Sequence, residues 1–175
     1  MRTRLAAMAV LALWASAQAA DTPQEAANAF YAVYATFHPS DGIPDQAGRA
    51  KYNAVVSPAL AALLQRAGTA EEDFHKANKD APPLVEGDLF TSLFEGAGSY
   101  RVGACRAEGR QAFCPVELAA KDGKGKPVHW SDTVYLAQAS SGWRVDDIGY
   151  GGNWAFANKG RLTQTLQQIV ATAGE

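Results

Sequence analysis

The sequence has little of the chemistry that defines most enzyme and metal-site classes. It contains 2 cysteines, 3 histidines and 2 methionines among 175 residues. The histidines (His38, His75 and His129) are scattered, and no two have the spacing of a zinc site. A G-x-S-x-G nucleophile motif is absent, and the glycine-rich residues 149–154 lack the G-x-G-x-x-G pattern of a phosphate-binding loop. We therefore predict neither a cofactor nor a metal.

Long apolar runs are also missing, with one exception at the beginning of the chain. Residues 5–14 are entirely apolar, follow Arg2 and Arg4, and precede the small residues 15–20. A basic head, a short apolar middle and an A-x-A site are typical of a secretory signal peptide, and this run is half of the roughly 20 residues that span a bilayer. We predict a signal peptide over residues 1–19 that is cleaved before Ala20, with cleavage after Ala17 as the alternative.

The surroundings of this signal predict the route and the destination. Thr3 separates Arg2 from Arg4, so the twin-arginine pattern is absent and the general secretory route is favoured. No cysteine lies near the cleavage site for a lipid to modify, and no later segment is apolar enough to span a membrane. We expect a periplasmic protein without a lipid anchor or a transmembrane segment.

The remaining residues, 20–175, have the length of one ordinary domain with a mildly acidic character. Of 16 basic residues, Arg2 and Arg4 leave with the signal, and the remaining 14 against 18 acidic residues give a formal charge of −4. This balance disfavours nucleic acid or an anionic membrane surface as a partner. The expected partner is a protein or a small molecule of the periplasm.

The two cysteines, Cys105 and Cys114, predict a structural disulfide, because an even count in an exported protein points to a bridge. A redox-active pair would need C-x-x-C spacing, which is absent. A hairpin that turns at residues 108–110 sets the cysteines opposite each other but pairs Val102 with Glu117, which mixes the two faces. A bulge at Gly103 would satisfy both demands.

The order of predicted elements is helices, then strands, then a closing helix. One helix begins at Thr22-Pro23 and stops at His38-Pro39, residues 39–48 form a loop, and a second helix begins at Ser57-Pro58. Gly68 is a candidate interruption of that helix, which continues to residue 79. Alternating apolar residues predict hairpins over 100–118 and 128–150, and helical spacing returns over 162–170. We expect an α+β fold with N-terminal helices on one face of a curved antiparallel sheet.

Asp132 is the first candidate for a functional residue. It shares a strand face with four apolar residues: Val128, Trp130, Val134 and Leu136. A carboxylate that points towards the core must be paired or hydrogen-bonded, or its pKa must rise. Asp132 is therefore either a general base or ligand anchor in a pocket, or a structural acceptor for an indole N–H, backbone N–H groups or Arg144.

Asp147 is the second candidate, because we expect it to share a face with Trp143 and Val145, on the strand beside Asp132. Two close carboxylates would share a proton or hold a cation, and ion-pair and turn roles are the alternative. Glu86, Asp88 and Glu95 lack the spacing of a calcium loop and are interpreted as loop residues. The predicted ligand-binding residues, mostly aromatic, are Trp130, Asp132, Trp143, Asp147, Tyr150 and Trp154.

Residues 82–90 and 142–148, together with the order of elements from Ser57-Pro58 through Trp130-Ser131-Asp132, resemble a domain-of-unknown-function family of exported bacterial proteins. Such proteins are similar to the nuclear-transport-factor-two-like cone, also described as cystatin-like. The resemblance implies a curved sheet folded over helices, sometimes around a pocket. It implies no agreed activity, and no catalytic residue is carried over from it.

Three functions follow from these observations. The first is a non-enzymatic module that binds a ligand or a protein. The second is a cone-type enzyme that acts on a small apolar molecule with Asp132 as base, and the third is an immunity-type inhibitor of a delivered toxin. An enzyme needs Asp132 in an open cavity, whereas a binding module can bury it in a closed core.

Overall fold

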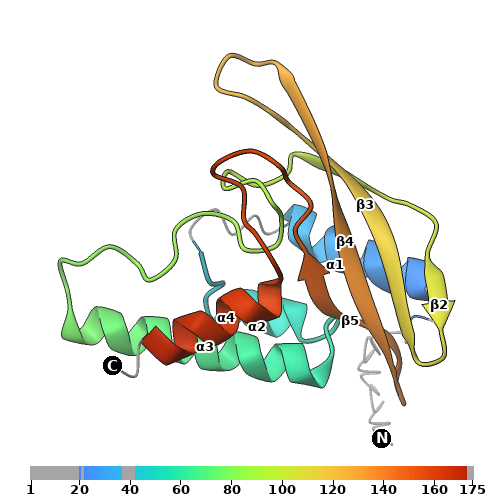
Figure 1. The fold of residues 1–175 in the computed structure, drawn as a ribbon. Coiled ribbons are helices and arrows are strands. Elements are labelled where there is room, and N and C mark those ends of the chain that lie inside the picture. The colour runs from blue at the N-terminus through green and yellow to red at the C-terminus, as the bar shows by residue number, and fades with distance from the viewer. Residues whose placement is uncertain (1–19, 21, 37–41, 173–175) are drawn as a thin grey trace, which may run out of the picture.

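The computed structural model describes residues 20, 22–36 and 42–172 (Figure 1). The predicted signal peptide and the predicted helix end at His38-Pro39 lie outside these residues. Within the described part, four helices and five strands form the predicted α+β fold. The helices are α1 (Pro23–Thr36), α2 (Gln46–Tyr52), α3 (Pro58–Ala77) and α4 (Leu162–Thr172); the strands are β1 (Ser99–Val102), β2 (Arg106–Glu108), β3 (Gln111–Lys121), β4 (Pro127–Ala139) and β5 (Gly142–Gly149).

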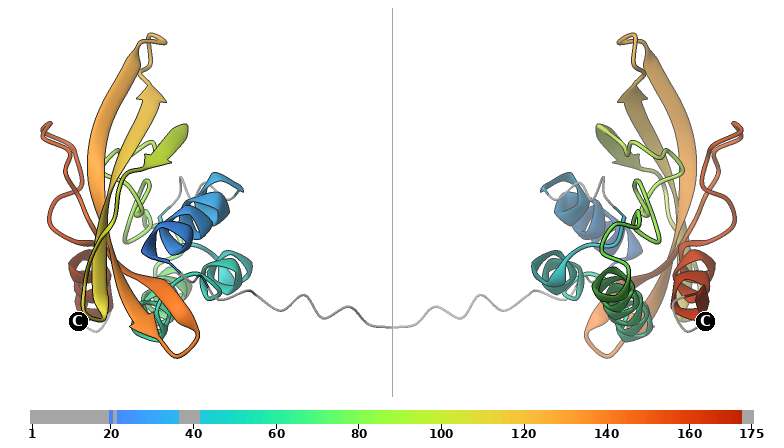
Figure 2. Two further views of the ribbon diagram at one scale, coloured as in Figure 1. Left: turned by 90° about the vertical axis from the view of Figure 1, so that its right-hand side faces the viewer. Right: turned by 90° about the vertical axis from the view of Figure 1, so that its left-hand side faces the viewer.

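The sheet is antiparallel and curved, with the strand order β1-β3-β4-β5 and β2 paired to β3 (Figure 2). The α1 helix packs across one face, which we call the inner face, and α3 packs with α4 beside β5. The opposite, outer face of β3, β4 and β5 faces the viewer in Figure 1. No helix among the described residues is long and apolar enough to cross a membrane.

The first helix begins as the sequence predicts. The Glu25 backbone N–H donates to Thr22 Oγ1 at 3.2 Å, and the Thr22 N–H donates to the Glu25 carboxylate at 3.0 Å, which forms a capping box. The buried face of α1 carries Phe30, Tyr31 and Tyr34. These rings fill the space between the helix and the inner face of the sheet.

Two predictions about the helices are wrong. The predicted loop over residues 39–48 ends earlier, because Asp45 caps a short helix, α2, by accepting a hydrogen bond from the Gly48 N–H. The α3 helix also runs through Gly68 without a break. A Cβ atom at Gly68 would lie 2.1 Å from Arg49 Nη1, so glycine at this position leaves room for the buried Arg49 side chain.

The disulfide and the shift in register around it are confirmed. Cys105 and Cys114 form a bridge, with their Cα atoms 4.2 Å apart. Val102 pairs with Val116, whereas Arg106 pairs with Phe113, so four steps along one strand oppose three along the other. The extra residue lies within residues 103–105, where we predicted the bulge, and it lets the cysteines meet while the apolar residues keep their face.

A second irregularity, in β5, overturns the predicted placement of Asp147. Tyr135 pairs with Asp147, but Leu136 pairs with Val145, which leaves Asp146 as an extra residue. Because this bulge reverses the alternation, Asp147 lies on the outer face with Tyr135 and not on the face of Val145. Asp132 lies on the inner face, so the predicted carboxylate pair of Asp132 and Asp147 does not form.

Candidate functional site: a buried carboxylate network and an outer cleft

Asp132 joins two loops to the sheet inside a closed core. Its side chain is only 1% exposed. It accepts hydrogen bonds from the Ser92 N–H at 2.8 Å and the Gly151 N–H at 2.9 Å, and also from the Ser92 hydroxyl. The Trp130 indole N–H donates at 3.2 Å. Asp132 is therefore a structural acceptor for an indole N–H and for backbone N–H groups. Because its carboxylate is buried, it is not placed to accept a proton from a substrate.

Asp88, interpreted from the sequence as a loop residue, is also buried. The Tyr34 hydroxyl donates to Asp88 Oδ2 at 2.5 Å, and the Phe90 N–H donates to Oδ1 at 2.6 Å. The Ala97 N–H in turn donates to the Tyr34 hydroxyl at 2.7 Å. Burial raises the pKa of Asp88 to about 7, against the lowering effect of the hydrogen bonds from Tyr34 and Phe90. Among the described residues, no group of three or more potential side-chain ligands is arranged to hold a metal ion.

The predicted ligand-binding residues do not converge on one pocket. Trp130 and Trp154 meet edge to face with ring centroids 5.9 Å apart, and the Tyr150 hydroxyl donates to the Leu89 carbonyl at 2.6 Å. Trp143 lies at the opposite end of β5, where its backbone N–H donates to the Ala20 carbonyl at 3.0 Å. These aromatic residues therefore contribute mainly to the core and its edges.

Asp147 is the predicted site residue that lines a cleft, on the outer face of the sheet. Phe113, Tyr135 and Asp147 are neighbours across β3, β4 and β5, and they form a row along its floor. The cleft has a volume of about 400 Å³. Its lining residues are Glu108, Gln111, Ala112, Phe113, Tyr135, Leu136, Asp146, Asp147, Arg161 and Thr163.

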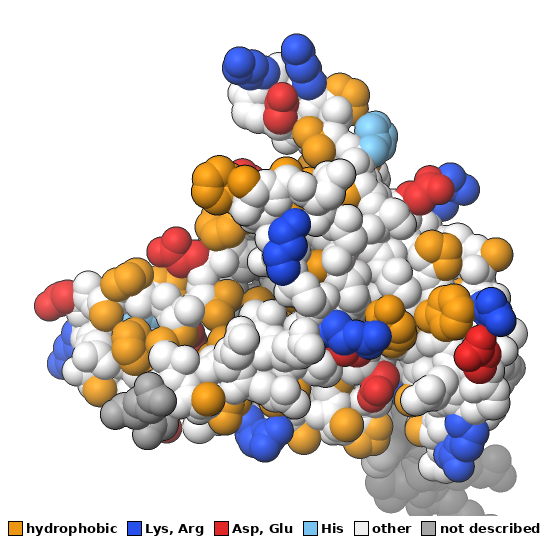
Figure 3. Space-filling model, in the orientation of Figure 1, with side chains coloured by type: hydrophobic (Ala, Val, Ile, Leu, Met, Phe, Trp, Pro, Cys, Tyr) orange, Lys and Arg blue, Asp and Glu red, His pale blue; other side chains and the backbone are white. Residues whose placement is uncertain are grey.

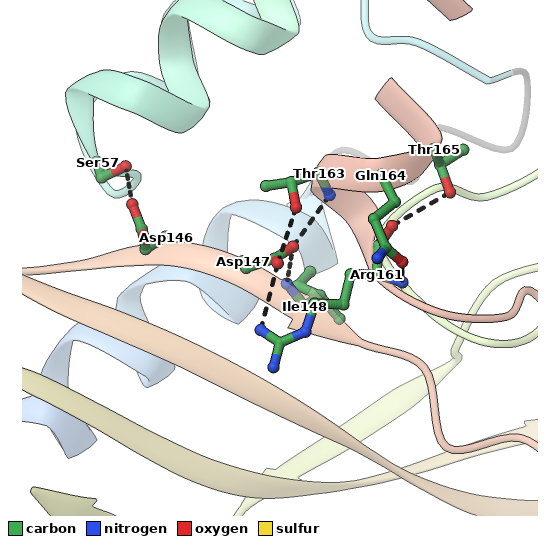
Figure 4. Close-up of polar contacts among 8 residues, drawn as sticks. All are labelled: Ser57, Asp146, Asp147, Ile148, Arg161, Thr163, Gln164 and Thr165. Carbon is green, nitrogen blue, oxygen red and sulfur yellow. Dashed lines mark hydrogen bonds and ion pairs between the residues drawn. The ribbon is translucent and has the colours of Figure 1, made fainter. Parts of the chain in front are cut away.

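Arg161 is the cation of this cleft, and two neighbours hold its guanidinium group in place. The guanidinium carbon lies 3.8 Å from the centroid of the Tyr135 ring, and Nη1 lies 3.4 Å from Asp147 Oδ2 (Figure 4). The side chain is still 42% exposed. Asp147 is the only side chain in the described part of the chain to which the guanidinium donates, so most of its five N–H groups remain available.

Asp147 has a clear structural role in addition to its contact with Arg161. Its carboxylate accepts hydrogen bonds from the Thr163 N–H at 3.0 Å and the Thr163 hydroxyl at 2.9 Å (Figure 4). The Ile148 N–H donates at 2.9 Å. A carboxylate at the first turn of α4 satisfies a free N–H group and favours the helix dipole. Asp147 thus joins β5 to the beginning of α4.

Asp146, the extra residue of the bulge, faces a different partner. The Ser57 hydroxyl donates to Asp146 Oδ1 at 2.5 Å, and it also accepts from the Leu60 N–H as the cap of α3 (Figure 4). At the far end of the cleft, Glu108 is exposed and lies 3.1 Å from Arg106 Nε. The lining therefore carries one cation, Arg161, among three carboxylates.

The sequence analysis missed Tyr135 and Arg161. Tyr135 follows Ser131 and Thr133 on the outward face of β4, and a large ring on an otherwise polar face was the available signal. Arg161 had no comparable signal, because its position depends on the return of residues 150–160 to the sheet. That return is held by the bridge between Gly149 and Arg161 and by the hydrogen bond from the Tyr150 N–H to the Gly160 carbonyl.

Comparison with known proteins adds little to this geometry. No family model and no curated protein matches the chain. A solved structure of a phospholipid-binding protein from Ralstonia solanacearum, in complex with a phospholipid, is similar at 12% identity and a TM-score of 0.31 over 86% of this chain and 84% of that one. Those values are too low to transfer a ligand, and the resemblance to a family of exported bacterial proteins stays a prediction.

Proposed function

We propose that this chain is an exported binding module without catalytic activity, and that the outer cleft holds a small ligand. The observation that supports this most directly is the state of Arg161. Its guanidinium is fixed by Tyr135 and Asp147 but still exposes unused donors to the cleft. A cation that is already ordered loses little further freedom when a ligand binds, which favours affinity.

The size and lining of the cleft support a small molecule as ligand. A volume of about 400 Å³ lies in the range of roughly 300–1,000 Å³ that is usual for small-molecule sites. Apolar surface comes from the half-buried Phe113 ring on the outer face, and polar groups come from Gln111 and Arg161. An aromatic ring on the floor and a few fixed polar groups give such a cleft the means to orient a small ligand.

Two observations support export to the periplasm. Ala20, the residue after the predicted cleavage site, forms a bridge with Trp143 at the end of β5, so the first residue of the predicted mature protein is part of the fold. The disulfide between Cys105 and Cys114 is typical of proteins that fold in an oxidising compartment. The proposed route is general secretion with cleavage before Ala20.

The alternative functions are supported to different degrees. An enzyme with Asp132 as base is disfavoured, because this carboxylate is closed in the core. A contact with a partner protein is favoured by two exposed rings, Phe94 at 45% and Phe156 at 88%. The loops that carry these rings are joined by Asn158, whose side-chain amide donates to the Asp88 and Thr91 carbonyls. An immunity-type inhibitor would use such a surface, and it stays a prediction.

The ligand-binding proposal is tested by mapping where small molecules bind. We would record two-dimensional NMR spectra of residues 20–175 with a mixture of small acidic, basic and neutral fragments. We expect shifts of the Tyr135, Asp147 and Arg161 amide signals, and we expect Arg161→Ala to abolish them. Arg101→Ala is the matched control, because Arg101 is an exposed arginine on β1 that pairs with Glu117 outside the cleft. Shifts confined to other surfaces, or shifts unchanged in Arg161→Ala, would contradict the proposal.

A further inference from the structure

We infer that the ligand of the outer cleft is a small monocarboxylic acid with a flat apolar body, whose carboxylate binds Arg161 and whose body lies over Phe113. This inference rests on the proposed binding function and names the class of ligand. Three features of the cleft support it: the geometry of the guanidinium, the charges around it, and the apolar floor.

The guanidinium geometry favours a planar, two-oxygen partner. Stacking on Tyr135 at 3.8 Å fixes the plane of the Arg161 group, and the contact with Asp147 uses Nη1 at a long 3.4 Å. Among the described residues, Nε and Nη2 of Arg161 have no hydrogen-bond acceptor, so the Nε–Nη2 edge is available to a ligand. Such an edge matches a carboxylate through two parallel hydrogen bonds, a geometry that a lysine ammonium does not provide.

The surrounding charges disfavour a more highly charged anion. Phosphate sites commonly combine several cations or use the N–H groups of a helix N-terminus. Here the beginning of α4 is already occupied by the Asp147 carboxylate, to which the Thr163 N–H donates. Asp146 and Glu108 add further negative charge to the lining. Each negative charge of a ligand is repelled by these carboxylates, so a dianion is disfavoured more strongly than a monoanion placed against Arg161.

The floor of the cleft provides the apolar contact. Phe113 is half-buried on the outer face, where it pairs with Tyr135 on the neighbouring strand. Arg106 lies 6.0 Å from the Phe113 centroid, but it is also paired with Glu108. On the outer face of the sheet, Figure 3 shows hydrophobic side chains between positively charged ones. A flat apolar body is therefore expected to lie over the Phe113 ring while its carboxylate reaches Arg161.

The test compares three probes that carry the same phenyl ring: phenylacetate, its neutral planar amide phenylacetamide, and the tetrahedral dianion phenyl phosphate. We would titrate each into residues 20–175 and follow the cleft signals by NMR. We expect phenylacetate to bind at least about tenfold more tightly than either of the others, since a factor of ten corresponds to one well-placed charged interaction. Equal affinity for phenylacetate and phenylacetamide, or tighter binding of phenyl phosphate, would overturn the inference.

Two variants separate the guanidinium geometry from its charge. Arg161→Lys keeps the positive charge but removes the parallel N–H edge, so we expect it to lose most of the preference for phenylacetate over phenylacetamide. Arg101→Lys is the control and keeps that preference. If the fragment mixture shifts the cleft signals but none of the three probes does, the ligand class is wrong and the binding function stands. If neither shifts them, both fail.

Discussion

At the scale of single residues, the three buried aspartates face different sets of donors. Asp132 and Asp147 each accept from backbone N–H groups and from side chains on other elements. Asp88 accepts from Tyr34 and from a backbone N–H in a region filled by rings, where Tyr52 stacks on Phe90 with centroids 4.5 Å apart. Burial among rings penalises the charged form of a carboxyl group, which explains why the pKa of Asp88 rises.

The raised pKa of Asp88 predicts a dependence of stability on pH. Its folded pKa of about 7 lies above the ordinary value of 3.8, so the folded protein holds a proton that the unfolded chain releases. The stabilising contribution is full below about pH 4 and is lost as pH rises through 7, by an amount on the order of 4 kcal/mol at most. Urea unfolding at several values of pH between 4 and 8 measures this loss.

Asp88→Asn is the variant that isolates the effect, because an amide does not titrate in this range. We expect its free energy of unfolding to change less between pH 4 and 8 than that of the unmodified protein. The carbon-13 signal of the Asp88 carboxyl group gives a second measurement that does not depend on folding of the variant. A titration midpoint near 4 for that signal would rule out the proposed role of burial.

At the scale of elements, the sequence predicted one of the two irregularities in the sheet. Around Cys105 and Cys114, the disulfide and the apolar alternation demanded different registers, and the conflict itself predicted an extra residue. In β5 there was no such conflict, because Asp146 and Asp147 are both acidic and either one can face outwards. Only the buried Ile148 after them marks the change of face. The outer cleft was missed for this reason, since it depends on the side that Asp147 faces.

The helices show the same limit. The α1 and α3 helices were predictable from their caps and apolar spacing, both of which are local. The α2 helix and the continuity of α3 depend on Arg49, whose Nη1 donates to the Pro44 carbonyl at 2.8 Å and whose Nη2 contacts Glu72 at 3.0 Å. No local pattern in the sequence links a buried arginine on one helix to a glycine on another. Helix propensity alone therefore suggested, wrongly, that Gly68 interrupts the helix.

The contact between Gly68 and Arg49 predicts a reversal in the effect of a substitution. Gly68→Ala favours a helix by about 1 kcal/mol from propensity. In the unmodified protein, the new Cβ would lie 2.1 Å from Arg49 Nη1 and force Arg49 from its place. We expect net destabilisation there and a gain of about 1 kcal/mol when Arg49→Ala is also present. Urea unfolding of the four proteins in this cycle measures the coupling, and additive effects would contradict the proposed contact.

At the scale of the whole molecule, the arrangement of layers explains where a ligand site is available. Among the described residues, α1 lies against the inner face of the sheet (Figure 2), and its buried aromatic side chains belong to the core there. In the described part of the chain, no helix packs across the outer face of β3 and β4, and the beginning of α4 provides one wall of the cleft beside β5. The fold thus moves the available binding surface from the inside of the curved sheet to the outside.

The proposed export predicts how the whole chain is processed and how strongly the disulfide stabilises it. Expressed with residues 1–19, the protein should appear in the periplasm with Ala20 as its first residue and with the bridge formed; expressed without them, it should stay in the cytoplasm in reduced form. The cysteines are 9 positions apart, and closing a loop of this size stabilises a fold by about 2–3 kcal/mol. The double variant Cys105→Ala/Cys114→Ala should lose that amount of unfolding free energy. The unmodified protein should lose the same amount only when a reductant opens the disulfide.

Intact mass and N-terminal sequencing of the periplasmic protein show whether residues 1–19 have been removed. An uncleaved chain in the membrane fraction, or a bridge that forms without export, would show that the first residues serve another purpose.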